Sequence, residues 1–167
     1  MSASTASPMS DLPARVLRVF AADLQSPPRI TLRGGNALDS YDLPEPFDPV
    51  LDAVSDDYLE RHWWGVAHLD APSWRHYLPQ LMVYSLRHRH DYRMATEALL
   101  FSLRPPDREP PRLAALSAAE EAVVCEFLDV MAFDERSVHQ ELARTALEEW
   151  WAPGALYRHG PRTPAPE

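Results

Sequence analysis

The longest run of helical hydrophobic periodicity lies in the stretch Ser73–Arg104. Pro79 suits the first turn of a helix, where a fixed φ and a missing N–H are tolerated, so the spacing predicts a helix that begins near Leu78. A second helix is predicted over residues 92–103, and the pair of prolines after it ends it. A connection this short favours antiparallel packing, and we expect the two helices to form the centre of the fold.

The same periodicity predicts helices in four other parts of the chain. Each begins at a residue whose side chain accepts hydrogen bonds from first-turn amides, and Ser117 with Glu120 forms a capping-box pattern. The predicted helices span residues 11–24, 48–60, 117–133 and 135–151, and the last two resemble a second antiparallel pair. We therefore predict a compact all-α bundle of about five or six helices in antiparallel pairs.

One stretch departs from the helical pattern. Residues 29–33 alternate polar and apolar positions with β-branched members, which favours a short extended segment, and residues 34–36, Gly-Gly-Asn, have the composition of a turn. In the loop that follows, Tyr41, Leu43 and Phe47 stand among prolines and acids. We expect these three side chains to pin the loop onto the helices.

The length of 167 residues favours one domain. We expect a flexible N-terminal segment over residues 1–10, a single helical domain over 11–152 and a flexible tail over 153–167. The one cysteine, Cys125, excludes an intrachain disulfide and lies in an apolar run, as a small buried hydrophobic residue does. No apolar run has the length of a membrane span and residues 1–10 lack the order of a signal peptide, so we expect a cytoplasmic protein.

The formal net charge is −9, from 25 acidic residues against 16 basic ones. All 16 bases are arginine, and with 17 prolines this composition is typical of a GC-rich bacterial genome. The acidic balance disfavours nucleic-acid binding, although residues 87–93 with Tyr84 and Tyr92 resemble a small phosphate-and-stacking surface. An acidic surface suits a basic protein partner, and it is also an ordinary means of keeping a protein in solution.

A cluster of acids and tryptophans provides the candidate contact face. Asp56, Asp57 and Glu60 precede Trp63 and Trp64 closely in sequence. Tryptophans dominate the energetics of many interfaces, so we predict that these five residues bind the partner. The alternative is that the tryptophans bury their large area in the core.

Histidines suggest a second hypothesis, a metal-dependent enzyme. Its candidate ligands are His62, His88, His90 and Asp91, because imidazole and carboxylate groups suit zinc or iron. Residues two apart near a helix end point in different directions, which favours histidines that cap or face solvent instead. The sequence has no serine elbow, phosphate loop or dinucleotide fingerprint, so we predict no cofactor and no catalytic residue.

The segment Tyr77–Leu86, YLPQLMVYSL, resembles a bacterial domain family of unknown function whose members carry an aromatic-Leu-Pro helix followed by a short Leu-rich helix. The similarity extends to a helix with a Phe, as at residues 16–20, to a Trp ahead of the motif, as at Trp63, and to a capped helix, as at residues 117–128. It would cover most of residues 13–133. The resemblance implies a small cytoplasmic protein, in some members one thought to neutralise a toxin, and it transfers no catalytic residue.

These observations favour a non-enzymatic protein-binding factor, of the immunity or antitoxin kind, that masks a basic protein. The alternatives left open are the metal-dependent enzyme and a structural subunit of a larger bacterial assembly.

Overall fold

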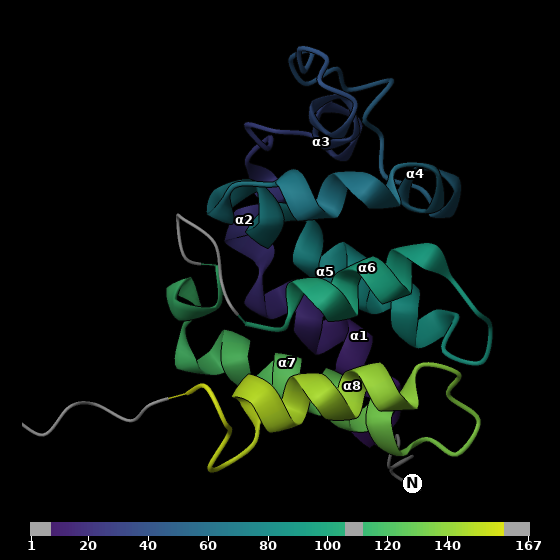
Figure 1. Cartoon of the computed structure of the whole chain (residues 1–167), viewed down its shortest axis with the longest axis vertical. Helices are drawn as coiled ribbons and strands as arrows, with labels where there is room; N and C mark the ends of the chain where they lie inside the picture. The colour runs from purple at the N-terminus through teal and green to yellow at the C-terminus, as the bar shows by residue number, and fades with distance from the viewer. Residues whose placement is uncertain (1–7, 106–111, 159–167) are drawn as a thin grey trace, which may run out of the picture.

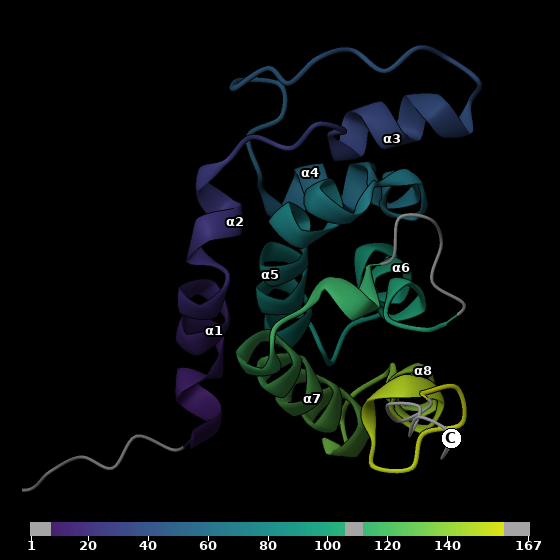
Figure 2. The ribbon, with the colours of Figure 1, turned by 90° about the vertical axis from the view of Figure 1, so that its left-hand side faces the viewer.

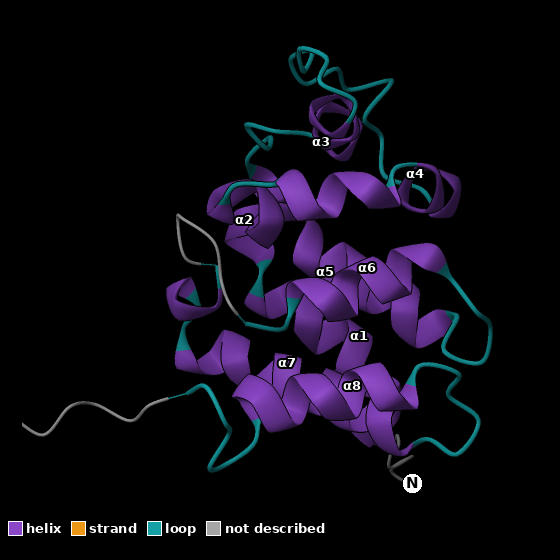
Figure 3. Cartoon of the chain, in the orientation of Figure 1, coloured by secondary structure: helices purple, strands orange, loops and turns teal. Residues whose placement is uncertain are grey.

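The protein is all-α in the residues that its computed structural model describes, 8–105 and 112–158 (Figure 3). No strand occurs in these ranges, which confirms the predicted fold class. The helix predicted over residues 11–24 is divided at Phe20 into two. The α-helices are α1 (Pro8–Val19), α2 (Ala21–Gln25), α3 (Leu32–Asp39), α4 (Asp56–Arg61), α5 (Ala71–Arg87), α6 (Met94–Ser102), α7 (Ala118–Phe133) and α8 (Gln140–Ala146). Two 3₁₀ helices, η1 (Trp63–His68) and η2 (Leu113–Ala115), and a π-helical turn, η3 (Leu147–Trp151), complete the described secondary structure.

Helix α5 is the central element of the fold. Figure 2 shows it beside α1 and α2, with α7 and α8 toward one end of the molecule and α3 at the other. Helix α6 runs back alongside α5. The start of α5 lies beside the end of α6, where the indole Nε1 of Trp74 donates to Ser102 Oγ (3.0 Å). The predicted antiparallel central pair is therefore present.

Helix α5 begins at Ala71, well before the predicted start near Leu78. The carboxylate of Asp70 accepts a hydrogen bond from Ser73 N (3.0 Å), and a proline lies in the first turn. Pro79 is therefore in the helix interior, where it removes one backbone hydrogen bond and is itself buried. The prediction assigned the helix start to the second of two prolines.

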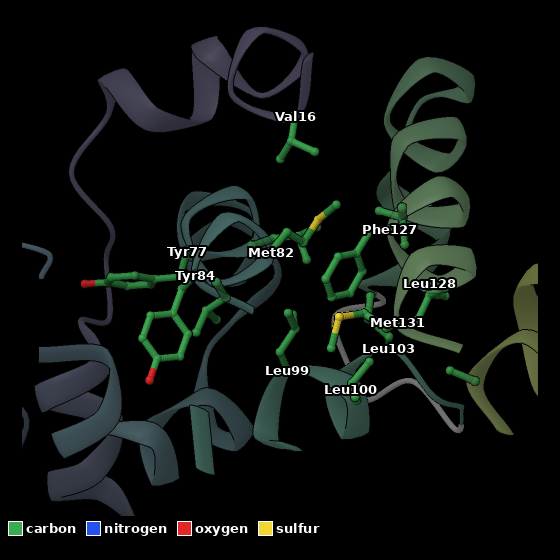
Figure 4. Packing of buried hydrophobic residues seen from close by; sticks show 14 of the residues in the cluster. Val16, Tyr77, Met82, Tyr84, Leu99, Leu100, Leu103, Phe127, Leu128 and Met131 are labelled. Carbon is green, nitrogen blue, oxygen red and sulfur yellow. The ribbon is translucent and has the colours of Figure 1, made fainter. Parts of the chain in front are cut away.

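One buried cluster joins α1, α5, α6 and α7 and also includes residues of α3, α4 and α8 (Figure 4). It contains fully buried side chains from α1, α5, α6 and α7, among them Val16, Met82, Leu99, Phe127 and Met131. Burying a side chain of this size contributes about 1.5–3 kcal/mol relative to its exposure. The apolar stripes of these helices thus face one common core.

Arg75 joins three distant segments of the chain at the side of this core. Its Nε donates to Asp23 Oδ1 (3.0 Å), its Nη2 to Glu120 Oε1 (2.6 Å) and its Nη1 to the carbonyl of Ala115 (2.9 Å). The second oxygen of Glu120 accepts from the amide of Ser117 (2.7 Å), so the predicted capping box of α7 is confirmed. A lysine could not supply these contacts, since it lacks the forked geometry of the guanidinium.

Two predicted helices are shorter than the periodicity indicated. Over residues 48–60, the Asp48 carboxylate caps only a turn, and α4 starts after the side-chain cap of Ser55. Over residues 135–151, turns come first and α8 starts at Gln140. The amide of Val138 donates to the carbonyl of Arg89 (3.1 Å), so a contact across the fold replaces the first helical turn there.

The predicted extended segment over residues 29–33 ends early. Thr31 is extended (φ −76°, ψ 163°), and its hydroxyl accepts from Gly34 N (2.8 Å), so α3 begins directly after it. Gly34 and Gly35 lie inside α3, and the prediction of a turn at residues 34–36 is wrong. A Cβ on Gly35 would lie only 2.5 Å from the carbonyl oxygen of Gly65 in η1, so the two elements cross where both residues lack a side chain.

The expected flexible ends, residues 1–10 and 153–167, lie largely outside the described residues. Helix α1 begins at Pro8, inside the first of these segments. At the other end, the amide of Leu156 donates to the carbonyl of Glu148 in η3 (2.9 Å). The described start of the tail is therefore hydrogen-bonded to the last helical turn.

Candidate functional site

Acidic residues are concentrated in one part of the chain. Residues 34–60 contain 8 of the 25 acids and no arginine or histidine, whereas the other 140 residues carry 17 acids against 16 arginines. The segment comprises most of α3, the loop after it and the first turns of α4, toward the end of the molecule at which α3 lies (Figure 1). The formal net charge of −9 therefore arises almost entirely from this segment.

Residues 40–51, here called the arm, follow α3 and carry apolar side chains into solvent. Tyr41 is 100% exposed and Leu43 is 92% exposed, so the prediction that they pin the loop onto the helices is wrong for these two residues; Phe47 is 39% exposed. Prolines at positions 44, 46 and 49 prevent the arm from forming a helix whose apolar face could pack on the core. Its exposed large apolar residues are Tyr41, Leu43, Phe47, Val50 and Leu51.

Arg33 of α3 attaches the arm to the body of the protein. Its Nη1 donates to Glu45 Oε2 (2.7 Å) and its Nη2 to the carbonyl of Pro46 (3.4 Å), both in the arm. The same guanidinium donates through Nε (3.1 Å) and Nη2 (2.9 Å) to the two oxygens of Asp52, just beyond the arm. Hydrogen bonds from Arg33 to Asp52 and then to Glu45 raise the pKa of the guanidinium, so it stays charged at every physiological pH.

Asp52 is the buried end of this attachment. Its carboxylate is fully buried and also accepts from Tyr58 Oη (2.9 Å) and from the amide of Asp48 (2.9 Å). Burial acts to raise the pKa of Asp52, but the hydrogen bonds from Arg33, Asp48 and Tyr58 outweigh it and the net pKa is lowered. The pair of Arg33 and Asp52 thus fixes the end of the arm to α3, and the hydroxyl of Tyr58 joins it to α4.

Asp56, predicted to contact a partner, is engaged within the fold. Its Oδ1 accepts from Arg87 Nη2 (2.9 Å), and its Oδ2 lies 2.8 Å from His88 Nε2. The hydrogen bond with His88 is the main cause that lowers the pKa of the Asp56 carboxyl. These contacts join the start of α4 to the end of α5.

Glu60, also predicted to contact a partner, caps another helix. Its carboxylate accepts from the first two amides of α6, Met94 N (2.8 Å) and Ala95 N (3.2 Å), and from the hydroxyl of the buried Tyr84 (2.9 Å). Helix α6 has no side-chain cap from its own N-cap residue, Arg93. The carboxylate of Glu60 therefore performs a structural role in α6.

The other three predicted contact residues differ in their accessibility. Asp57 is exposed on α4. Trp63 and Trp64 stack on each other, with ring centroids 3.8 Å apart and an interplanar angle of 26°; Trp63 packs against the core, while Trp64 is 54% exposed. Of the five predicted residues, Asp57 and Trp64 thus present free surface.

The four candidate metal ligands are directed to different partners. His88 Nε2 faces Asp56, and its Nδ1 lies 3.9 Å from Oδ2 of the exposed Asp91. His90 Nε2 lies 3.0 Å from Asp134 Oδ2. His62 ends α4, and burial is the main cause that lowers its pKa. Among the described residues, no three histidine, cysteine or carboxylate side chains are placed to hold a metal ion.

Comparison with known proteins gives a family and no activity. None of the described helices has the length and apolar character needed to cross a membrane. Neither the curated proteins nor the solved structures include a match to this sequence. Residues 9–155, most of the chain, match a family of unknown function, which confirms the predicted resemblance to such a family. The chain belongs to this family, DUF6714.

Proposed function

We propose that this chain is a non-enzymatic binding factor of the immunity or antitoxin kind, which masks a basic protein in the cytoplasm. The observation that carries the proposal is the separation of charge: 8 acids and no base within residues 34–60, in a chain that is otherwise nearly balanced. Such a surface attracts a basic partner over several ångströms and rejects acidic ones.

Exposed side chains beside this charge support the proposal. Asp39, Asp42 and Asp57 are exposed; Oδ1 of Asp39 lies 2.9 Å from Nε2 of His68 in η1. Trp64, on the element that crosses α3, offers an exposed ring whose partner Trp63 holds it in place. Charged residues provide attraction and orientation, and a rigid aromatic side chain provides buried area at low entropic cost.

The test begins with retention of proteins from native lysate by the tagged chain at low and at high salt. The retained protein is identified by mass spectrometry, purified, and its association measured directly. We expect one stoichiometric basic protein whose affinity falls as salt rises, because screening weakens attraction between exposed charges.

Matched variants locate the effect. Asp42→Asn with Asp57→Asn removes two exposed charges from the acidic segment, and Glu135→Gln with Glu148→Gln removes two exposed charges elsewhere. The first pair should lower the association rate constant at low salt by at least roughly threefold, and the second pair should leave it unchanged. Equal effects of the two pairs, or a retained protein that is not basic, would overturn the proposal.

A further inference from the structure

The arm presents more apolar surface than its own fold uses. Tyr41 is fully exposed although it closely follows the end of α3 at Asp39, and it has φ 61°, a left-handed conformation that non-glycine residues rarely adopt. Leu43 is nearly as exposed, and Val50 follows at 82%. An exposed apolar cluster of this kind on a folded protein marks a contact surface.

Backbone and charged contacts hold the arm in one position, while Tyr41 and Leu43 remain exposed. At its start, Tyr41 N donates to the carbonyl of Leu38 (3.1 Å) and continues the end of α3. At its middle and end, Arg33 binds Glu45 and the buried Asp52. Three prolines reduce the freedom of the backbone between these points. A segment ordered before binding loses less entropy when a partner immobilises it.

The charges around the exposed apolar side chains specify the partner. Asp39 and Asp42 flank Tyr41, and Glu45 follows Leu43, with no base in the arm. A hollow of about 430 Å³ beside the arm is lined by Asp42, Leu43 and Glu45 together with Arg33 and Ala37. The one cation there already faces two carboxylates, so the hollow suits an arginine or lysine whose stem covers the leucine.

We propose that the arm inserts Tyr41 and Leu43 into an apolar pocket of a partner protein, and that lysine or arginine residues on the rim of that pocket pair with Asp42 and its acidic neighbours. This inference rests on the basic partner of the proposed function and names the element that binds it. The apolar side chains determine how long the complex lasts, and the acids determine how fast it forms.

A photo-cross-linker tests the contact directly. p-Benzoylphenylalanine is placed at position 41 in the arm and, as a control, at the exposed position 133 at the end of α7, in the full chain within native cells. We expect irradiation to link position 41, and not position 133, to the same basic protein that the wild-type chain retains. Peptide mapping should place the link in an apolar patch bordered by lysine or arginine.

Kinetics with the purified partner test the division of roles. Tyr41→Ser with Leu43→Ser keeps every charge, so the association rate constant should stay within about twofold while the dissociation rate constant rises at least roughly tenfold. The matched control is Phe133→Ser with Leu156→Ser, two similarly exposed apolar residues outside the arm, which should change neither constant. Unchanged circular dichroism and urea midpoints for both double variants show that the fold is intact.

Failure of the arm and failure of the proposed function give different results. If a basic protein is retained but position 41 does not link to it, or the arm variant dissociates like the control, the partner exists and the arm inference is overturned. If position 41 links to a second copy of the chain or to a protein that is not basic, the proposed partner chemistry is overturned for the arm. If nothing is retained and nothing links, both proposals fail.

Discussion

Removal of the Glu60 carboxylate gives a sharp measure of its structural role. Glu60→Ala takes the acceptor from the first two amides of α6 and from the buried hydroxyl of Tyr84. Loss of a helix cap costs about 1 kcal/mol, and a buried hydroxyl without an acceptor costs about 1–3 kcal/mol. We expect a total loss of about 2–4 kcal/mol in the free energy of unfolding. For a chain of this length, that loss lowers Tm by roughly 4–16 °C.

The assay is urea unfolding followed by far-ultraviolet circular dichroism, with Asp57→Ala as the matched control on the same helix. Asp57 is exposed, so its removal should change the free energy of unfolding by no more than about 0.5 kcal/mol. A double-mutant cycle with Tyr84→Phe should give a coupling energy of about 1 kcal/mol between Glu60 and Tyr84. The reasoning is refuted if Glu60→Ala and Asp57→Ala destabilise equally, because Glu60 would then be a surface acid like its neighbour.

Three further substitutions probe other contacts of the fold by urea unfolding. Although burial acts in the opposite direction, hydrogen bonds hold the pKa of Asp52 below its ordinary value, so its stabilisation is present above the unfolded pKa of about 3.9 and lost below it. The difference in unfolding free energy between wild type and Asp52→Asn should therefore narrow as pH falls below about 5 and continue to narrow through the lower folded-state pKa, and a constant difference would contradict this. Gly65→Ala should cost about 1–3 kcal/mol or more, because the new Cβ overlaps the carbonyl of Leu32; a neutral effect would show that the crossing is loose. Ser102→Ala should cost about 1–3 kcal/mol, since it leaves the indole N–H of Trp74 buried without an acceptor, and the same substitution should cost less in a Trp74→Phe background, which has no indole N–H.

Periodicity predicted the all-α class because each apolar stripe reports on burial of one helix face, a local property. It placed the start of α5 at Leu78 although Asp70, with a proline two residues later, offered an equally valid cap and first turn. Here two local signals competed, and the choice of Pro79 as the start was wrong. The helix starts after Asp70 because this start includes the buried residues before Pro79 in the apolar face of α5.

Gly34 and Gly35 show a limit of local inference. Their composition is that of a turn, but both lie inside α3, where Gly35 allows the close crossing with Gly65, thirty residues later in sequence. The cost of glycine in a helix, about 1 kcal/mol per residue, is offset by packing that no local window contains.

In the candidate site too, features that depend on local sequence could be predicted, and contacts with distant residues could not. The acidic segment was visible in the sequence, and Asp57 and Trp64 are exposed as a contact face requires. The capping role of Glu60 was missed because the amides that it accepts from, those of Met94 and Ala95, lie more than thirty residues away in sequence. Tyr41 was misassigned on the assumption that large apolar residues are buried. The sequence did contain a signal of an exposed arm: its apolar residues stand among prolines and acids and lack helical spacing.

The contacts of Arg75 have a consequence for the rates at which the protein folds and unfolds. Its hydrogen bonds to Asp23 and Glu120 join residues 52 and 45 positions apart in sequence. Closing loops of this length costs conformational entropy before the contacts can form. We expect these contacts to form after the folding transition state, so Arg75→Gln should accelerate unfolding and leave the folding rate nearly unchanged in stopped-flow measurements. This guanidinium would then determine the lifetime of the native state, and with it the exposure of the chain to proteases that cleave opened molecules.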